Sequence, residues 1–189
     1  MDADFSIELT ADDPVLDLPW TDASGQVTYY DLKRHPELIS KVNEAAKFPE
    51  LAAFLRSVNS PRSAFESAKC DAWTTSELSA EEEIFDAALK FSSYVDLVSS
   101  NSERRRLFDF HEGFARKLTD LLKRAPEMPA SAEVCVRRCF FAESQPALEG
   151  FYFTIYVNGY GADEPAARMN WAIGLQLAGN AILQLSANP

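Results

Sequence analysis

The sequence predicts an α+β fold, in which a four-stranded antiparallel sheet made of two β-β-α units carries two long helices on one face. An N-terminal hairpin and short helices complete the prediction. Two observations lead to it. Four segments of residues 63–189 alternate apolar and polar residues with the period of a half-buried strand. Each pair of such segments precedes a stretch whose apolar residues recur with the period of a helix, so the apolar strand faces are expected beneath the helices.

Residues 1–62 are predicted to form an N-terminal arm that packs on a β-β-α-β-β-α domain of residues 63–189. The polar sequence TDASG at 21–25 lies between two β-like segments and predicts a short hairpin. Pro36 and Pro49 each suit the first turn of a helix, and apolar residues at helical spacing follow both. The arm is therefore expected to contain a hairpin and two short helices.

The first β-β-α unit of the domain has strands predicted at residues 65–73 and 89–98 and an amphipathic helix at 104–122. On the second of these strands, Leu97 is expected to face the helices. Asp96, its neighbour, is expected to face away from them.

The second β-β-α unit has strands predicted at residues 132–142 and 150–161. Asp163 is placed to cap the last helix, which is predicted to run to about Leu185. The apolar residues of the two helices, and those of the second strands, recur at a constant offset between the two units, whereas those of the first strands do not. An internal repeat and a chance similarity of two amphipathic helices are both open interpretations.

The strand at 150–161 points its phenylalanines one way and its tyrosines, Thr154 and Asn158 the other way. Aromatic rings beside a few charged groups are typical of small-molecule sites. Because neighbours on a strand face opposite ways, one of Arg137 and Arg138 must point to the tyrosine side, and Arg138 is our candidate. The candidate ligand-binding residues on this side of the sheet are Lys69, Asp71, Trp73, Tyr94, Arg138, Tyr152, Tyr156 and Asn158.

Three interpretations of the tyrosine side of the sheet are open. The first is a ligand site. The second is a plain surface, or one covered by the N-terminal helices, because tyrosine, threonine and tryptophan favour strands whatever their function. The third is an interface between subunits.

The leading functional prediction is a soluble, cytoplasmic small-molecule-binding or regulatory module that uses the aromatic face of an antiparallel sheet. One alternative is an enzyme that performs acid–base chemistry on a polar organic substrate with a Tyr or Asp of that face, with His111 as a further candidate. Another is a protein-interaction module or a homodimer. The last helix is apolar over much of its circumference, which favours burial or docking against a second copy.

Composition excludes several classes of partner. The chain has 18 basic and 29 acidic residues and a net charge of −11, which opposes binding to nucleic acid or to an anionic membrane. The most apolar long stretch, residues 166–185, is interrupted by Arg and amide side chains and does not suit a membrane span. Three cysteines and an acidic N-terminus without signal-peptide features fit a reducing cytoplasm.

No metal site and no cofactor are expected from the motifs. The chain has two histidines and three scattered cysteines, and Cys135 and Cys139 lie about 13 Å apart along one strand face. Gly159 and Gly161 precede a helix, but acidic residues at the helix start would repel a phosphate. A catalytic residue is not identifiable from the sequence.

Overall fold

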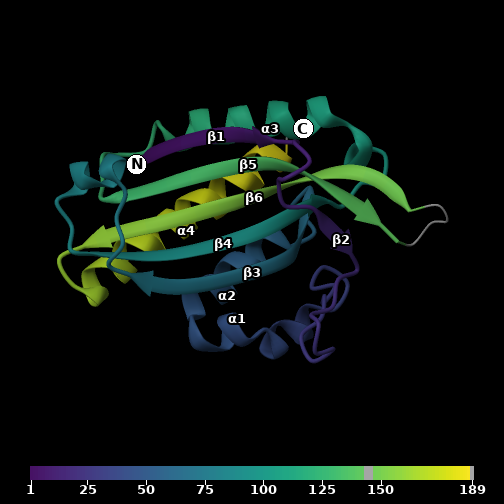
Figure 1. Ribbon diagram of the computed structural model, residues 1–189, viewed down its shortest axis with the longest axis horizontal. Coiled ribbons are helices and arrows are strands. Elements are labelled where there is room, and N and C mark those ends of the chain that lie inside the picture. The colour runs from purple at the N-terminus through teal and green to yellow at the C-terminus, as the bar shows by residue number, and fades with distance from the viewer. Residues whose placement is uncertain (143–146, 188–189) are drawn as a thin grey trace.

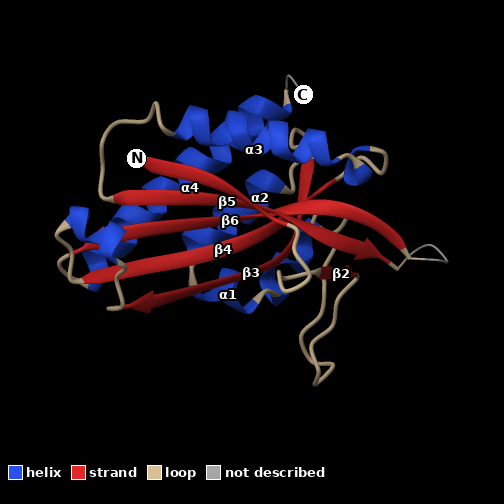
Figure 2. Cartoon of the chain, turned by 45° about the horizontal axis from the view of Figure 1, so that its top comes forward, coloured by secondary structure: helices blue, strands red, loops and turns tan. Residues whose placement is uncertain are grey.

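Six strands form one mixed sheet, and the helices cover one of its faces (Figures 1 and 2). The computed structural model describes residues 1–142 and 147–187, without the side chains of residues 81, 83 and 84. The elements in chain order are β1 (Asp2–Glu8), β2 (Leu16–Leu18), η1 (Pro36–Lys41), α1 (Asn43–Lys47), α2 (Pro49–Val58), β3 (Phe65–Thr75), η2 (Ala80–Phe85), β4 (Leu89–Ser99), η3 (Arg104–Arg106), α3 (Phe108–Leu122), β5 (Ala130–Phe141), β6 (Leu148–Gly161) and α4 (Glu164–Ser186).

The strand order is β1-β5-β6-β4-β3, with β2 also paired to β5. Four strands, β3 to β6, pair antiparallel as predicted. The prediction of a sheet with only these four strands is wrong, because β1 and β2 both pair with β5 in the parallel direction. The sheet is therefore mixed, and the N-terminal segment forms part of it.

The expected hairpin around residues 21–25 is reduced to a single bridge between Thr21 and Thr28. Before this bridge, residues 16–18 are recruited into the main sheet as β2. The short helices expected after Pro36 and Pro49 are confirmed as η1, α1 and α2.

The apolar strand faces lie beneath α2, α3 and α4, as the alternation of residues predicts. Phe65, Phe91, Phe153 and Ile155 are almost fully buried in one cluster that also contains Trp171 of α4. Asp163 caps α4 as expected, because its Oδ1 accepts a hydrogen bond from the amide of Ala166 at 2.9 Å. Because neighbouring side chains on a strand point to opposite faces, the residues that alternate with these apolar ones lie on the face without helices.

The last helix is held on several sides at once. At Gly174 an added Cβ would lie 2.9 Å from Val157 of β6, and at Gly179 it would lie 3.4 Å from Phe54 of α2. Met169 and Ile173 remain exposed on the outer side of α4. Homodimerisation through this helix stays a prediction. Among the described helices, α4 included, none combines the length and hydropathy that a membrane crossing requires.

The backbone of α4 approaches the sheet closely at Gly159 of β6. A Cβ at this position would collide with backbone atoms of Ala167 and Trp171, lying 2.6 Å from the Cα of Trp171. Gly159→Ala is therefore expected to lower the free energy of unfolding by about 3 kcal/mol, since backbone atoms cannot move aside as a side chain can. Denaturant titration measures the change.

Gly113→Ala on α3 is the matched control for this substitution. Nothing lies within 4 Å of an added Cβ at Gly113, so alanine should raise the free energy of unfolding by about 0.5–1 kcal/mol through helix propensity. Equal stability of the two alanine variants would contradict the packing described for α4.

Candidate ligand-binding site on the open sheet face

The sheet face opposite the helices, called here the open face, carries polar and aromatic side chains in register. Across the strands, Tyr156 of β6 pairs with Tyr94 of β4 and with Glu133 of β5. On the far side of Tyr94, the next partner is Asp71 of β3. One row of side chains therefore reads Glu133, Tyr156, Tyr94 and Asp71 from β5 to β3.

Segment 16–29 covers one end of the open face. Leu16 and Leu18 of β2 bury Val98 and Tyr152 in a second apolar cluster. Trp20 packs against the same cluster, and its indole Nε1 donates a hydrogen bond to the carbonyl of Ala68 at 2.7 Å. These contacts remove that end of the face from water.

The 3-10 helix η2 covers the other end of the open face. The carboxylate of Glu82 accepts hydrogen bonds from Lys90 Nζ at 2.7 and 2.9 Å and from the hydroxyl of Tyr160 at 2.7 Å. The ring of Phe85 stacks on Tyr160 with centroids 4.1 Å apart. Tyr160 is consequently only 1 % exposed.

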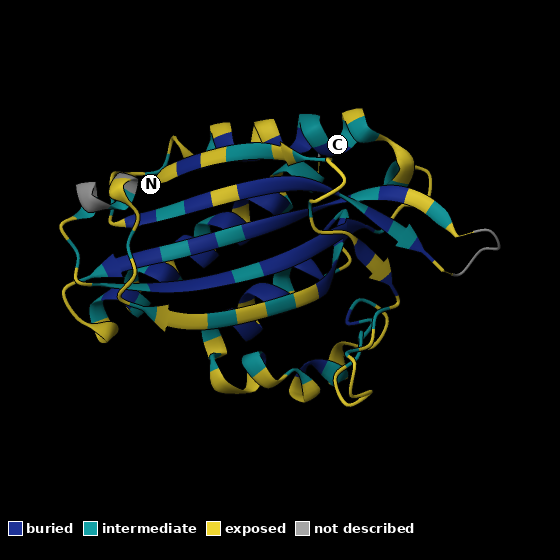
Figure 3. Cartoon of the chain, viewed as in Figure 1, coloured by how far each residue is buried: buried dark blue, intermediate teal, exposed yellow. Residues whose placement is uncertain are grey.

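Between these two covers lies a strip of the open face, called here the central strip, on which no chain segment packs among the described residues (Figures 1 and 3). Its floor combines buried hydroxyl and carboxyl groups with half-exposed rings. The side chains of the central strip are Asp2, Asp4, Ser6, Lys69, Asp71, Trp73, Ser92, Tyr94, Asp96, Ser131, Glu133, Cys135, Thr154, Tyr156 and Asn158.

A chain of hydrogen bonds stiffens the floor of the central strip. The guanidinium of Arg137 donates from Nε to Glu8 at 2.6 Å and from a terminal nitrogen to the hydroxyl of Thr154 at 2.8 Å. Thr154 in turn donates to Oδ1 of Asp96 at 2.6 Å. A longer contact of 3.3 Å runs from Arg137 to the hydroxyl of Tyr156. Such a connected network fixes each group in one orientation.

Asp96 is the most perturbed carboxyl group of the strip. It is 5 % exposed, and burial raises its pKa from the usual 3.8 to about 6. The hydrogen bond from Thr154 and the charges of Arg137 and Lys69 oppose this rise without cancelling it. Among the described residues, Oδ2 of Asp96 has no hydrogen-bond partner, so one oxygen stays available.

Three aromatic rings line the strip above this network. The rings of Tyr94 and Tyr156 lie 6.0 Å apart, and those of Trp73 and Tyr94 lie 6.4 Å apart. Burial raises the pKa of Tyr94 above its usual range, with the charges of Asp96 and Asp71 adding to the effect. Tyr94 therefore stays protonated at neutral pH.

A groove of about 690 Å³ adjoins the strip at the edge of β3. It lies between the sheet and the connector around Trp20 and Tyr30, and it reaches the strip through Lys69, Asp71 and Tyr94. This volume is within the range of pockets that hold small organic molecules.

Of the sequence-predicted site residues, all but Arg138 lie on the open face. Tyr152 faces this side but is 3 % exposed beneath β2, so it is not accessible. The expectation for Arg138 is wrong, because Arg137 occupies the open face while Arg138 points away and donates to the carbonyl of Thr10. The six predicted residues that lie together on the central strip are Lys69, Asp71, Trp73, Tyr94, Tyr156 and Asn158.

Several residues of the site were missed because β1 was not predicted. Glu8, Ser6 and Asp4 reach the open face only through the parallel pairing of β1 with β5. Their alternation with Phe5 and Ile7 is a period-two signal that could have indicated this strand.

His111 does not belong to this site. It lies on α3, on the opposite side of the sheet, and is fully buried between aromatic rings including Phe110 and Phe151. Its Nδ1 bonds to the carbonyl of Leu107 at 2.9 Å, and burial lowers its pKa to about 4. A catalytic role for His111 together with open-face residues is therefore wrong on geometry.

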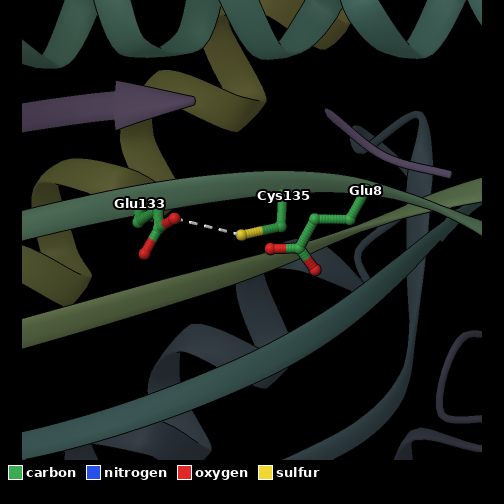
Figure 4. A group of neighbouring side chains, drawn as sticks. All are labelled: Glu8, Glu133 and Cys135. Atoms are coloured by element: carbon green, nitrogen blue, oxygen red, sulfur yellow. Dashed lines mark hydrogen bonds between the residues drawn. The ribbon is translucent and has the colours of Figure 1, made fainter. Parts of the chain in front are cut away.

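Glu8, Glu133 and Cys135 form a cluster whose potential ligand atoms lie within 4.8 Å of one another (Figure 4). The thiol of Cys135 contacts Glu133 at 3.4 Å, and burial raises the pKa of this thiol to about 12. Glu8 is already paired with Arg137 at 2.6 Å. The thiol stays protonated and the Glu8 carboxylate is held by Arg137, so Glu133 alone of the three offers a free anionic ligand. The cluster therefore does not fit a metal ion.

Comparisons of this chain with family models, curated proteins and solved structures found no match. The geometry of the open face is therefore the basis for assigning a function. Its combination of an accessible strip, a stiff polar floor and a perturbed carboxyl group is typical of functional sites.

Asp96 makes stability depend on pH. Its folded-state pKa lies above its unfolded value, so the folded chain binds more protons between about pH 4 and 6, and stability falls as pH rises through this window. Asp96→Asn keeps an acceptor for Thr154 and should be more stable than the wild type at pH 7.5 by on the order of 2–3 kcal/mol.

Chemical denaturation at pH 4 and pH 7.5 measures this difference. The two proteins should have nearly equal stability at pH 4. His111 has the opposite slope, because its pKa is lowered, but its contribution cancels between wild type and variant. An Asn variant that is less stable than the wild type at pH 7.5 would show that the Asp96 carboxylate is satisfied in the folded state.

Proposed function

We propose that the central strip binds a small polar organic molecule, so that the protein acts as a binding or regulatory module. The observation that carries this proposal is the selective exposure of the strip. Segment 16–29 and η2 bury both ends of the same face, yet Tyr94 and Tyr156 between them stay half-exposed. Aromatic surface next to ordered polar groups is suited to hold a ligand and to orient it.

The buried carboxyl group of the strip lowers the stability of the folded chain, and this supports the same proposal. A carboxyl group as buried as Asp96 destabilises the folded chain once it ionises. An apolar or amide side chain at this position would avoid that cost. Groups that lower stability in this way are concentrated at sites where they serve binding or chemistry.

Acid–base catalysis is a second candidate function, and Asp96 is the observation that favours it. A carboxyl group with a pKa of about 6 can donate or accept a proton near neutral pH. Thr154 holds its Oδ1, which leaves Oδ2 as the atom that would exchange a proton with a substrate. Asp96→Asn separates the two functions, because it would abolish turnover by an enzyme and only alter the affinity of a binding module.

Tyr156→Ala tests the binding proposal. The ring lies on the accessible strip, so its loss should lower the free energy of unfolding by about 1 kcal/mol or less. Thermal-shift measurements against a panel of amines, amino acids, carboxylic acids, sugars and nucleosides should find a compound that raises Tm of the wild type. The same compound should leave Tm of Tyr156→Ala unchanged.

Tyr152→Ala is the matched control, because Tyr152 occupies the same strand face beneath β2. Its truncation should lower the free energy of unfolding by about 3 kcal/mol or more, as for an aromatic residue of the core. The binding proposal fails if no compound raises Tm, or if the shift persists in Tyr156→Ala.

A further inference from the structure

We propose that the ligand of the central strip is a linear aliphatic polyamine, lying across the strands over Tyr94 and Tyr156. This inference rests on the proposed function and names the ligand class. The observations behind it are the charge of the strip, the order of side chains in its middle row and the unpartnered acceptors in its floor.

The charge of the strip favours a cation. Among its described side chains, five carboxyl groups face a single basic group, the ammonium of Lys69. Arg137, which reaches over the strip from one end, is already paired with Glu8. The acids of the strip are Asp2, Asp4, Asp71, Asp96 and Glu133.

The neighbouring surface adds to this charge. The first 32 residues, which supply β1, β2 and much of the wall of the adjoining groove, contain eight acidic residues and no lysine, arginine or histidine. A concentration of one sign of charge raises the local concentration of ligands of the opposite sign. An anionic ligand would be repelled by the same field.

The middle row suits a ligand with charges at both ends and an apolar middle. Glu133 and Asp71 stand at the two ends of the row, with Tyr156 and Tyr94 between them. Three strand spacings of about 4.8 Å separate the ends by about 14 Å at the backbone. Methylene groups would pack on the phenol rings, and each terminal ammonium would lie near one carboxylate, where the ring faces also attract cations.

The floor contains two oxygen atoms that can accept a hydrogen bond and have no partner among the described residues. The hydroxyl oxygen of Ser92, beside the middle row on β4, is buried and has no hydrogen-bond partner among the described residues. Oδ2 of Asp96 is likewise unpaired among them. Ammonium groups are pure donors, with three N–H bonds each, and therefore complement such a floor.

The two covers limit the length of the ligand along the strands. Segment 16–29 and η2 close the strip at both ends. A short chain that crosses the strands fits between them and can extend into the groove at the edge of β3. A long extended peptide along the strands would collide with the covers.

Isothermal titration calorimetry at low ionic strength tests this inference on the full chain. The probes are spermidine, butylamine with one ammonium, 1,8-octanediol as a neutral chain, and tetralysine. Spermidine should bind about tenfold more tightly than butylamine, because two linked charges engage two carboxylates. Its affinity should fall as salt is added, and octanediol should not bind.

Glu133→Gln and Asp71→Asn should each weaken spermidine binding about three- to fivefold, and both side chains are exposed, so folding is not at risk. Asp120→Asn, an exposed acid on α3 behind the sheet, is the matched control and should leave the affinity unchanged. Equal losses in all three variants would mean nonspecific attraction to an acidic protein and would overturn the inference.

The remaining outcomes separate this inference from the proposed function. Spermidine binding no tighter than butylamine, or tetralysine binding more tightly than spermidine, overturns the polyamine assignment. If spermidine fails while another compound binds in a manner that Tyr156→Ala abolishes, the proposed function stands and only the ligand class is wrong. If nothing binds to the strip, both fail.

Discussion

The close packing of α4 on β6 is the constraint on which the rest of the structure depends. Gly159 lets the backbone of α4 approach the strand, and Trp171 fills the space beside it, with its indole Nε1 donating to the hydroxyl of Ser93 at 2.8 Å. With this face of the sheet covered by helices, strand alternation places most of the polar strand side chains on the opposite face. The chemistry of the protein is therefore concentrated on one side of the sheet.

A network of hydrogen bonds satisfies most of the polar groups that are buried on the open face. The guanidinium of Arg137 bonds to Glu8 of β1 and to Thr154 of β6, and Thr154 bonds to Asp96 of β4. The network therefore runs across the strands of the sheet from β1 to β4. The network satisfies most of its members but leaves Asp96 with a raised pKa. A rigid floor with one unpaired carboxyl oxygen suits ligand binding, because the side chains lose little conformational entropy when the ligand binds.

Local periodicity was sufficient to predict the four antiparallel strands, the long helices and the face on which Tyr94 and Tyr156 lie. It could not predict the pairing of β1 with β5, because parallel pairing joins segments more than a hundred residues apart. The prediction of Arg138 was wrong because Val134, Cys135 and Val136 are all apolar. This part of the strand therefore shows no alternation that would tell which of the two arginines points to the open face. Covering of Tyr152 by β2 is a tertiary contact that strand alternation does not contain.

Oxidative footprinting of the six tyrosines with mass-spectrometric readout tests most directly whether the middle of the open face is accessible and its ends are covered. The account predicts fast labelling of Tyr94 and Tyr156 and slow labelling of Tyr152 and Tyr160, which are 3 % and 1 % exposed. Protection of Tyr94 and Tyr156 to the level of Tyr152 and Tyr160 in the free protein would contradict it.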